Sequence, residues 1–509
     1  MTRSATGRSL FPAPRAAALA AFAVPLAVYV ATLPVGLTWA HDGADGGDLI
    51  AAARTLGIPH PPGYPLYTLV ARLFLLAGWG TPAHRVALLS AVAGAGAAWV
   101  LYWLCLALVG RARWPLALSA ALLWAFAPIP WGQAVIAEVY ALSALLAVGF
   151  VAALLHWRNT GSNAAWQGAW LLFGLGMAHH LLIAACLVPA AVWAWEQRRR
   201  TDGRAWGEAA GLVALGLSCY LYLPLRAAAS PPVNWGDART PTGFWWVVSA
   251  APYRHYVFAL PLAEWPSRVG AWAALLLSQF KVWGVALGLW GAVSLHERDR
   301  AASWGMLGLF AVITLYAIGY NTTDSYVYLL PALAVFAAWV AVGLADIAER
   351  IRARRKALGR TALAGIAAAL VALPALSLAM NWAACDLRGD REAQQYVDAA
   401  LGALPADAVV LADGDRETFA LWYARWGLDG TFRGEPISVG LLQFDWYRTQ
   451  VQGRNPDLAW PDPALPQEEW LAGFLSANLG RRPIFVTAPH LAPAGWGLEP
   501  AGPLLRVHR

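Results

Sequence analysis

Long apolar runs separated by short polar connections dominate the first 380 residues of the chain. A bilayer core requires about 20 mostly apolar residues per helix, and roughly eleven runs meet that need. They cover approximately residues 16–38, 84–109, 114–130, 134–156, 164–178, 180–196, 206–225, 267–294, 303–320, 326–345 and 361–380. The pattern predicts an α-helical polytopic membrane protein with about eleven transmembrane helices.

The tail that follows, residues 381–509, is less apolar and alternates helical and strand patterns. Residues 392–404 and 417–426 have helical periodicity, whereas 408–412 and 483–487 are short β-type runs. We therefore expect a transmembrane domain over residues 1–380 and a small C-terminal α/β domain over 381–509.

Arginines are distributed unevenly over the connections between the apolar runs. One set of alternate connections carries most of them, including Arg3, Arg8, Arg15, Arg111, Arg113, Arg158, Arg198–Arg200, Arg204, Arg298, Arg300 and the cations of 350–360. The opposite set carries Arg54, Arg72, Arg226, Arg239 and Arg254. Because cations are retained on the cytoplasmic side, the N-terminus is expected to be cytoplasmic. The C-terminal domain and two long loops, about 39–83 and 226–266, then lie outside.

Composition narrows the class of protein further. With 59% hydrophobic and 13% charged residues among 509, the chain is far more apolar than a soluble globular domain. Its net charge of +7 lies mainly in those connections, which excludes a nucleic-acid partner. The preference for Arg over Lys and the abundance of Ala are typical of a GC-rich bacterial genome, so we expect the bacterial cytoplasmic membrane. Four cysteines without CxxC spacing indicate neither a zinc site nor a disulfide framework.

The first outer loop contains the densest candidate chemistry, DGADGGDLIAAARTLGIPHPPGYPLY from Asp42. Asp45 and Asp48 are spaced i, i+3 at the start of an expected helix over 49–56, so they share one face. They are interpreted either as helix-capping acids or as a general base with a second acid. Prolines hold His60 and the nearby Tyr64 in a stiff loop, which suits either a structural turn or a ligand-binding ring.

Further polar residues fall on the same side of the predicted topology. Glu138 is expected in the outer end of the fourth span, where an ionisable group usually has a function. His179 and His180 are adjacent, so they face different sides and form no metal site; one of them could contact an anion. Arg226 suits a phosphate or snorkels to the interface. The remaining candidates are Asn234, Trp235, Asp237 and Asp324, and in the tail Asp413 and Asp415 are expected to cap a helix.

Several ordered motifs resemble a membrane family, long labelled a domain of unknown function, whose animal members are protein O-mannosyltransferases. They are DGGDLIAAARTLGIPHPPGYPLY, RVALLS, QAVIAEVYALSAL, the histidine pair, YLPLRAAASPPVNWGD and, in the tail, LADGDRETFALWYARW and LLQFDWY. The resemblance implies a GT-C glycosyltransferase fold and a polyprenyl-phosphate sugar donor. It places the catalytic acid at Asp45, while Asp48 stands where relatives usually carry Glu.

A GT-C-like mechanism would be an inverting displacement in which Asp45 is the base and Asp48 and Glu138 are orienting acids. Arg226, His180, His179 and His60 would contact the donor phosphate, and Tyr64, Asn234, Trp235, Asp237 and Asp324 the sugar or acceptor. The expected donor is a polyprenyl-phosphate hexose such as mannose, and the acceptor a Ser or Thr hydroxyl of an exported protein. No cofactor or metal is assigned. Transfer to a lipid or glycan, or a lipid-linked sugar transporter, remain alternatives, although no internal repeat supports transport.

Overall fold

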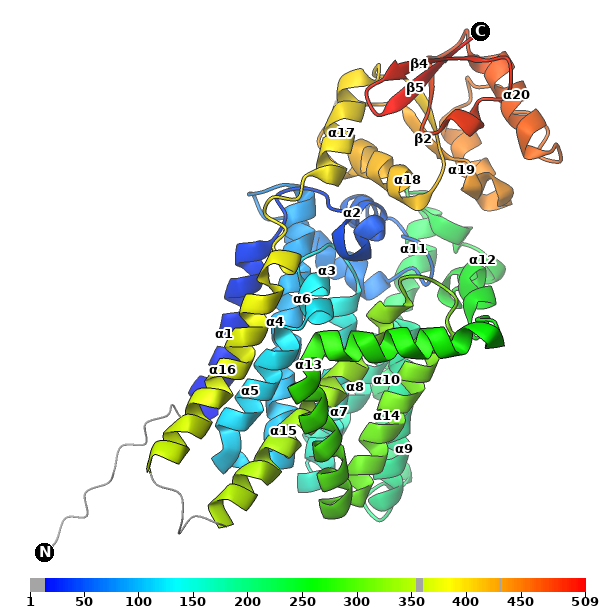
Figure 1. Ribbon diagram of the computed structural model, residues 1–509. Helices are drawn as coiled ribbons and strands as arrows, with labels where there is room; N and C mark the ends of the chain where they lie inside the picture. The colour runs from blue at the N-terminus through cyan, green and yellow to red at the C-terminus, as the bar shows by residue number, and fades with distance from the viewer. Residues whose placement is uncertain (1–13, 354–359, 431) are drawn as a thin grey trace, which may run out of the picture.

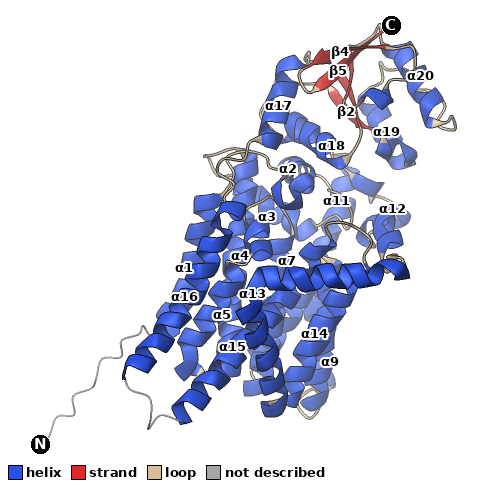
Figure 2. Cartoon of the chain, viewed as in Figure 1, coloured by secondary structure: helices blue, strands red, loops and turns tan. Residues whose placement is uncertain are grey.

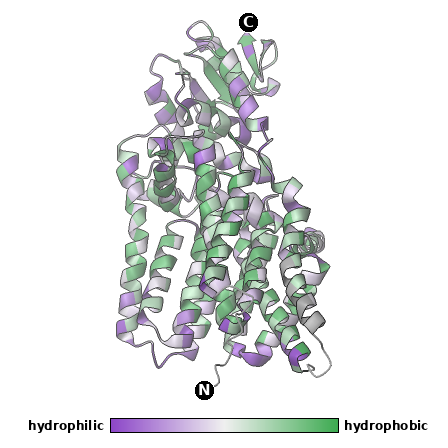
Figure 3. Cartoon of the chain, turned by 90° about the vertical axis from the view of Figure 1, so that its left-hand side faces the viewer, coloured by the Kyte–Doolittle hydropathy of each residue, from purple (hydrophilic) through white to green (hydrophobic). Residues whose placement is uncertain are grey.

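A bundle of long helices carries a smaller α/β domain on one of its ends (Figure 1). The computed structural model describes residues 14–353, 360–430 and 432–509. The bundle contains α1 (Pro14–Thr32), α4 (Pro82–Val109), α5 (Trp114–Ala125), α6 (Pro128–Ala134), α7 (Tyr140–Thr160), α8 (Asn163–Met177), α9 (Leu187–Glu196), α10 (Gly203–Leu217), α11 (Tyr222–Ala228), α13 (Trp265–Arg298), α14 (Arg300–Gly319), α15 (Leu330–Ala353) and α16 (Arg360–Cys385). Apolar residues cover these helices along most of their length (Figure 3). The chain is therefore a multi-pass membrane protein, as predicted.

Each of the predicted apolar runs coincides with a helix, but the count of eleven spans is not confirmed. Among the described residues, 7 helical segments are long and apolar enough to cross a membrane, or up to 8 if the bent pair α5–α6 is one span. That pair is bent by 67°. The helices over 65–75, 181–196 and 372–385 are apolar but shorter.

The predicted span 267–294 is not one straight helix. Helix α13 breaks at Lys281, whose φ of 56° and ψ of 173° are not helical. Figure 1 shows the consequence: the first half of α13 lies across the bundle, and the second half runs along it. The apolar pattern predicted helix correctly on both sides of Lys281 but contains no signal for the change of direction.

The first outer loop folds into two short helices, α2 (Gly46–Thr55) and α3 (Pro65–Leu75), at the end of the bundle next to the α/β domain. The second contains α12 (Pro241–Val248). The two loops are joined by a parallel β-bridge between Ile58 and Asn234, with Ile58 N donating to Val233 O over 2.8 Å and Trp235 N to Ile58 O over 3.1 Å. The backbone therefore holds the two loops in fixed register.

The C-terminal domain combines a five-stranded sheet with four helices, and Figure 2 shows the strands at this end of the molecule. The order is β2-β1-β3-β5-β4, with β2, β1 and β3 parallel and β5 antiparallel to both β3 and β4. The elements are α17 (Glu392–Ala403), β1 (Val409–Ala412), α18 (Asp415–Trp422), β2 (Glu435–Ser438), α19 (Asp445–Arg454), α20 (Gln467–Asn478), β3 (Ile484–Val486), β4 (Gly497–Ala501) and β5 (Leu504–His508). The small α/β domain predicted from the tail is present.

Helix α18 of the C-terminal domain packs directly on α2 of the first outer loop (Figure 1). The contact is close because Gly47 has no side chain: a Cβ there would lie 2.1 Å from the carbonyl oxygen of Phe419. Around it, Arg54 pairs with Asp429, and the Gln450 amide donates to Asn234 O over 2.8 Å. The α/β domain is thus seated on both outer loops.

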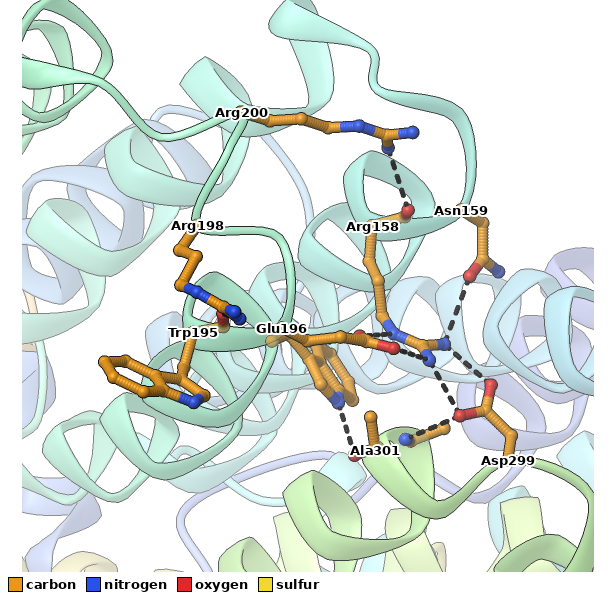
Figure 4. Close-up of polar contacts among 10 residues, drawn as sticks. Arg158, Asn159, Trp195, Glu196, Arg198, Arg200, Asp299 and Ala301 are labelled. Atoms are coloured by element: carbon orange, nitrogen blue, oxygen red, sulfur yellow. Dashed lines mark hydrogen bonds and ion pairs between the residues drawn. The ribbon is translucent and has the colours of Figure 1, made fainter.

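An ion-pair cluster joins three bundle helices at the opposite end (Figure 4). The Arg158 guanidinium, at the end of α7, donates to Glu196 over 2.5 and 2.8 Å and to Asp299 over 2.7 Å twice. The backbone carbonyl of Arg158 accepts from Arg200 over 3.3 Å. One arginine therefore ties the ends of α7, α9 and α14 together.

Candidate active site

A cavity of about 790 Å³ lies where the two outer loops, the bundle and the C-terminal domain meet. A volume of this size is typical of ligand pockets. Four carboxylic acids line it: Asp42, Asp45, Asp324 and Asp415. Seven tyrosines line it as well: Tyr64, Tyr140, Tyr253, Tyr256, Tyr316, Tyr320 and Tyr328. The cavity can therefore offer hydrogen-bond acceptors and flat aromatic faces to a polar ligand.

His60 stands between two of the acids that the sequence singled out. Its Nδ1 lies 2.8 Å from Asp48 Oδ2, which also accepts the His60 backbone N–H over 2.9 Å. Its Nε2 lies 3.5 Å from Asp45 Oδ2. The Asp48 side chain is fully buried, whereas 34% of the Asp45 side chain is exposed. The buried Asp48 therefore orients His60 by accepting its hydrogen bond. Asp45 is the acid of this pair whose carboxylate faces the cavity.

The charges of this trio shift the pKa values of both cavity-facing groups. Burial alone would lower the pKa of His60, but the carboxylates of Asp45 and Asp48 outweigh it and raise the pKa to about 9. Burial raises the pKa of Asp45 to about 6, against the opposing effect of His60.

Neither acid acts as a helix cap. Asp45 occupies the N-cap position of α2, but its side chain accepts no capping hydrogen bond. Asp324 likewise precedes a 3₁₀ turn, Ser325–Leu329, without a side-chain cap bond, and it faces the cavity. Capping, the structural interpretation considered for Asp45, therefore does not account for it, and it does not account for Asp324 either.

Tyr253 and Tyr256 of the second outer loop line the cavity, but the polar residues predicted in that loop lie behind its surface. Trp235 donates its indole N–H to Asp48 Oδ1 over 3.2 Å, so it helps to hold the buried carboxylate. Asn234 forms the backbone bridge to Ile58. Asp237 pairs with Arg239 over 2.6 Å in a bidentate contact. None of these three residues lines the cavity.

The adjacent histidines diverge, as the sequence indicated. His180 lines the cavity, and its Nδ1 accepts the Leu182 backbone N–H over 3.1 Å, which leaves Nε2 to carry the proton of a neutral ring. Burial lowers the pKa of His180 to about 3, so this ring acts as a neutral donor. His179 points elsewhere, with Nε2 2.9 Å from Val139 O. Tyr64 lies 6.1 Å from both imidazoles, measured between ring centroids, and lines the cavity.

Glu138 lies in a non-helical break instead of in a helix, and it does not line the cavity. The prediction that it sits within the fourth span is wrong, because α7 starts at Tyr140 and residues 135–139 form a non-helical break after α6. Its side chain is buried, and Oε2 accepts the Val139 N–H over 3.3 Å. Within the part of the chain that the structure describes, Oε1 has no hydrogen-bond partner. Burial raises the pKa of Glu138 well above its usual value.

Arg226 lies outside the cavity. Its Nε donates to Leu56 O over 2.6 Å and its Nη2 to Thr55 O over 3.3 Å, so it satisfies carbonyls at the end of α2. The arginine that does line the cavity is Arg416 of α18, which stacks on Trp39 at 4.3 Å and pairs with Glu392 at 3.0 Å. Of the residues predicted to contact the phosphate, Arg226 therefore does not line the cavity, whereas His60 and His180 do.

A second, apolar groove of about 320 Å³ adjoins the cavity, and Thr323 lines both. Its walls come from α13 and α14 and the turn that follows, including Trp272, Leu275, Ile318 and Leu329. Arg268 lies in the same groove, where its Nη1 donates to Thr322 O over 2.9 Å and Ser325 Oγ over 3.1 Å. A cation at the end of an apolar groove beside a polar cavity suits an amphipathic phosphate ligand.

Six tyrosines and two residues of the tail are among the lining residues that sequence reasoning missed. Tyr316 and Tyr320 are spaced i, i+4 at the end of α14, where Tyr320 is the C-cap residue, and this spacing is a signal that could have found them. Asp415 was expected to cap a helix, and no local pattern connects it with a cavity whose other walls come from the outer loops and the bundle.

The family model and the curated relatives that match this chain carry the same protein name. Residues 45–202 match the model of the Protein O-mannosyl-transferase TMEM260 N-terminal domain. The chain is 28% identical over 495 residues to Protein O-mannosyl-transferase TMEM260 of Mus musculus, covering 91% of this chain and 68% of that protein. It is 20% identical over 501 residues to the Dictyostelium discoideum protein of the same name, covering 87% of this chain and 60% of the relative.

A solved structure shares the fold. ArnT from Cupriavidus metallidurans bound to undecaprenyl phosphate superimposes with a TM-score of 0.62 at 14% identity, covering 96% of this chain and 97% of ArnT. The resemblance predicted from the sequence motifs is therefore confirmed: this chain is similar to the protein O-mannosyl-transferases of the TMEM260 family and shares the GT-C-type fold of ArnT.

Proposed function

We propose that this protein is a glycosyltransferase that moves a hexose, mannose or a similar sugar, from a polyprenyl-phosphate donor to a hydroxyl group. The acceptor hydroxyls are those of Ser and Thr in exported proteins. The observation that carries the proposal is Asp45, a partly exposed carboxylate on the cavity wall backed by His60 and the buried Asp48. The names of the TMEM260 relatives support mannosyl transfer, and ArnT bound to undecaprenyl phosphate supports a lipid-phosphate ligand in this fold.

In the proposed reaction Asp45 is the general base. The acceptor oxygen forms a bond to the anomeric carbon while the bond from that carbon to the phosphate oxygen breaks, so the configuration inverts. The acceptor proton passes to the Asp45 carboxylate, and the bonding electrons leave with the polyprenyl phosphate. A carboxylate with a pKa of about 6 is well matched to this task at neutral pH. Cationic His60 keeps Asp45 ionised between turnovers.

The donor is proposed to approach through the apolar groove. Its isoprenoid chain would lie against Trp272, Leu275 and Leu329, where apolar contact replaces lipid. Arg268 and the neutral donor His180 would then stabilise the departing phosphate, the first through charge and the second through its Nε2–H. Tyrosines of the cavity would stack on the sugar ring. Arg226, the phosphate contact expected from the sequence, has no part in this arrangement.

The reaction is proposed to take place at the outer face of the bacterial cytoplasmic membrane. The cavity lies at the end of the bundle that carries the two cation-poor long loops. Arg158 and Arg298 stand at the ends of α7 and α13, and Arg198–Arg200 follow α9, at the other end of the bundle. If the cation-rich end is cytoplasmic, the cavity lies on the outer side of the membrane, where exported acceptors are found.

Transfer by the full-length protein in proteoliposomes tests the proposal, with tritiated mannose on a polyprenyl phosphate as donor and a Ser/Thr-containing peptide as acceptor. Asp45→Asn should lower turnover at least about 100-fold, since the base is lost. The matched control is Asp237→Asn, which changes an outer-loop acid paired with Arg239 and should retain near-wild-type turnover. Near-wild-type turnover by Asp45→Asn would remove Asp45 from the mechanism. Label recovered in lipid or glycan instead of peptide would replace the protein acceptor by the alternative one.

A further inference from the structure

One segment of the cavity wall comes from the C-terminal domain. The connection between β1 and α18, residues 413–415, lies at the carboxyl end of the parallel strands, where α/β sheets commonly bind ligands. Asp415 and Arg416, the first two residues of α18, line the 790 Å³ cavity together with Asp45 and His60. The cavity is thus closed on this side by a domain that the membrane bundle does not contain.

The position of this connection is fixed by the packing of α18 on α2. Phe419, one turn after Asp415, stacks on His60 with ring centroids 6.4 Å apart and an interplanar angle of 17°. Its carbonyl oxygen lies against Gly47, where no side chain larger than hydrogen fits. Asp415 is therefore held in register with Asp45 through two helices in contact, without dependence on a long flexible loop.

Asp415 is free to bind a ligand, whereas its neighbour is occupied. Arg416 pairs with Glu392 and stacks on Trp39. In the described parts of the chain, no group donates a hydrogen bond to the Asp415 carboxylate, although Asp45, Asp48 and His60 are close enough to act on it electrostatically. Asp415 lines the cavity and remains exposed there, so its carboxylate is accessible to a ligand.

The cavity has two distinct approaches. The apolar groove with Arg268 enters between bundle helices, where a lipid-linked donor can stay in the membrane. Asp415 lies on the wall supplied by the C-terminal domain, which stands beyond the end of the bundle (Figure 1). A water-soluble acceptor has to reach Asp45 from this second side.

We propose that Asp415 is an acceptor-binding residue whose carboxylate accepts a hydrogen bond from a backbone N–H of the polypeptide beside the Ser or Thr that receives the sugar. This inference rests on the proposed function and adds the C-terminal domain to its substrate site. A carboxylate that accepts from a backbone N–H makes a strong, charge-assisted contact, and it selects a peptide over an acceptor without N–H groups.

The test uses full-length protein in proteoliposomes with polyprenyl-phosphate tritiated mannose and a synthetic Ser/Thr peptide. Asp415→Ala should raise the peptide KM about tenfold or more, because a hydrogen bond to a charged group is lost. The donor KM and the slow hydrolysis of the donor by water should stay unchanged, and Asp415→Glu should restore part of the peptide affinity. The matched control is Asp413→Ala in the same connection, whose carboxylate pairs with His490 at 2.8 Å outside the cavity.

An unchanged peptide KM in Asp415→Ala would overturn the inference. A parallel change in donor hydrolysis would also overturn it, since that result indicates general damage to the cavity. If the wild-type protein transfers no mannose from this donor to any acceptor, the proposed function fails and the inference fails with it. The wild-type reaction therefore separates the two failures.

Discussion

His60 donates its Nδ1–H to the buried carboxylate of Asp48 over 2.8 Å. The bond fixes the ring so that its other nitrogen is directed toward Asp45, 3.5 Å away. Twelve positions separate His60 from Asp48 in the chain, and the proline-rich turn between α2 and α3 brings them together. A carboxylate that orients a histidine, which in turn supports a second carboxylate, is a way to keep a base ionised within a partly enclosed cavity.

The pH dependence of transfer should report Asp45. Its carboxylate must be unprotonated to accept the proton, so kcat/KM should fall about tenfold per pH unit below a pKa of about 6. Burial raises this pKa and His60 lowers it. His60→Gln removes the lowering charge, so the acid limb should move to higher pH. His84→Gln, which changes a histidine hydrogen-bonded to Pro34 O, serves as the control. An acid limb at the same pH in His60→Gln and wild type would contradict the coupling.

Any side chain at position 47 should disturb the packing of the C-terminal domain on the first outer loop. An alanine Cβ would lie 2.1 Å from the backbone carbonyl of Phe419, so α18 has to move. Overpacking of this kind costs about 1–3 kcal/mol, and transfer should fall because the cavity wall shifts. Gly46→Ala is the matched control, since its Cβ would lie 3.4 Å from Ala137 O and 3.6 Å from Ala137 Cβ. Thermal unfolding in detergent and limited proteolysis of the C-terminal domain measure the difference. Equal stability of the two variants would show that the close contact between Gly47 and Phe419 does not limit the packing of α18 on α2.

Arg158 should contribute to the stability of the bundle and leave the chemistry unaffected. Its side chain is 10% exposed, and Arg158→Ala leaves the carboxylates of Glu196 and Asp299 without their partner (Figure 4). Because those carboxylates are one-third exposed, we expect a loss of about 1–3 kcal/mol, below that of a fully buried pair. Arg204→Ala removes an exposed, solvent-screened pair with Glu208 and should change the stability less. Thermal unfolding of both variants in one detergent decides the comparison; a smaller loss for Arg158→Ala than for Arg204→Ala would contradict it.

Arg268 should determine the affinity for the lipid donor. Arg268→Gln removes the charge beside the apolar groove and should raise the donor KM about tenfold or more, with the peptide KM unchanged. Arg226→Gln is an informative comparison, because its guanidinium serves backbone carbonyls at the end of α2. That variant should lower stability with little effect on the donor KM. A larger rise of the donor KM in Arg226→Gln than in Arg268→Gln would restore the phosphate contact expected from the sequence.

Local sequence patterns predicted the features that depend on near neighbours. Apolar runs located the bundle helices, because burial in a bilayer demands continuous apolar length. The tail elements 392–404, 408–412, 417–426 and 483–487 match α17, β1, α18 and β3 within a few residues, apart from the end of α18. The sequence also drew attention to Asp45, Asp48 and His60, because acids and a proline-held histidine beside a membrane segment are unusual.

Contacts between distant segments decided the rest. Arg226 donates hydrogen bonds to carbonyls at the end of α2, and Glu138 lies in the non-helical break between α6 and α7. Asp415 lines the cavity although it belongs to the C-terminal domain. Each of these positions depends on backbone geometry that no local pattern encodes. The sequence by itself determined a membrane bundle with a small α/β domain and a group of polar residues at one end. Only the tertiary structure decided which of them share a cavity, because side chains meet through the packing of α18 on α2 and the bridge between Ile58 and Asn234.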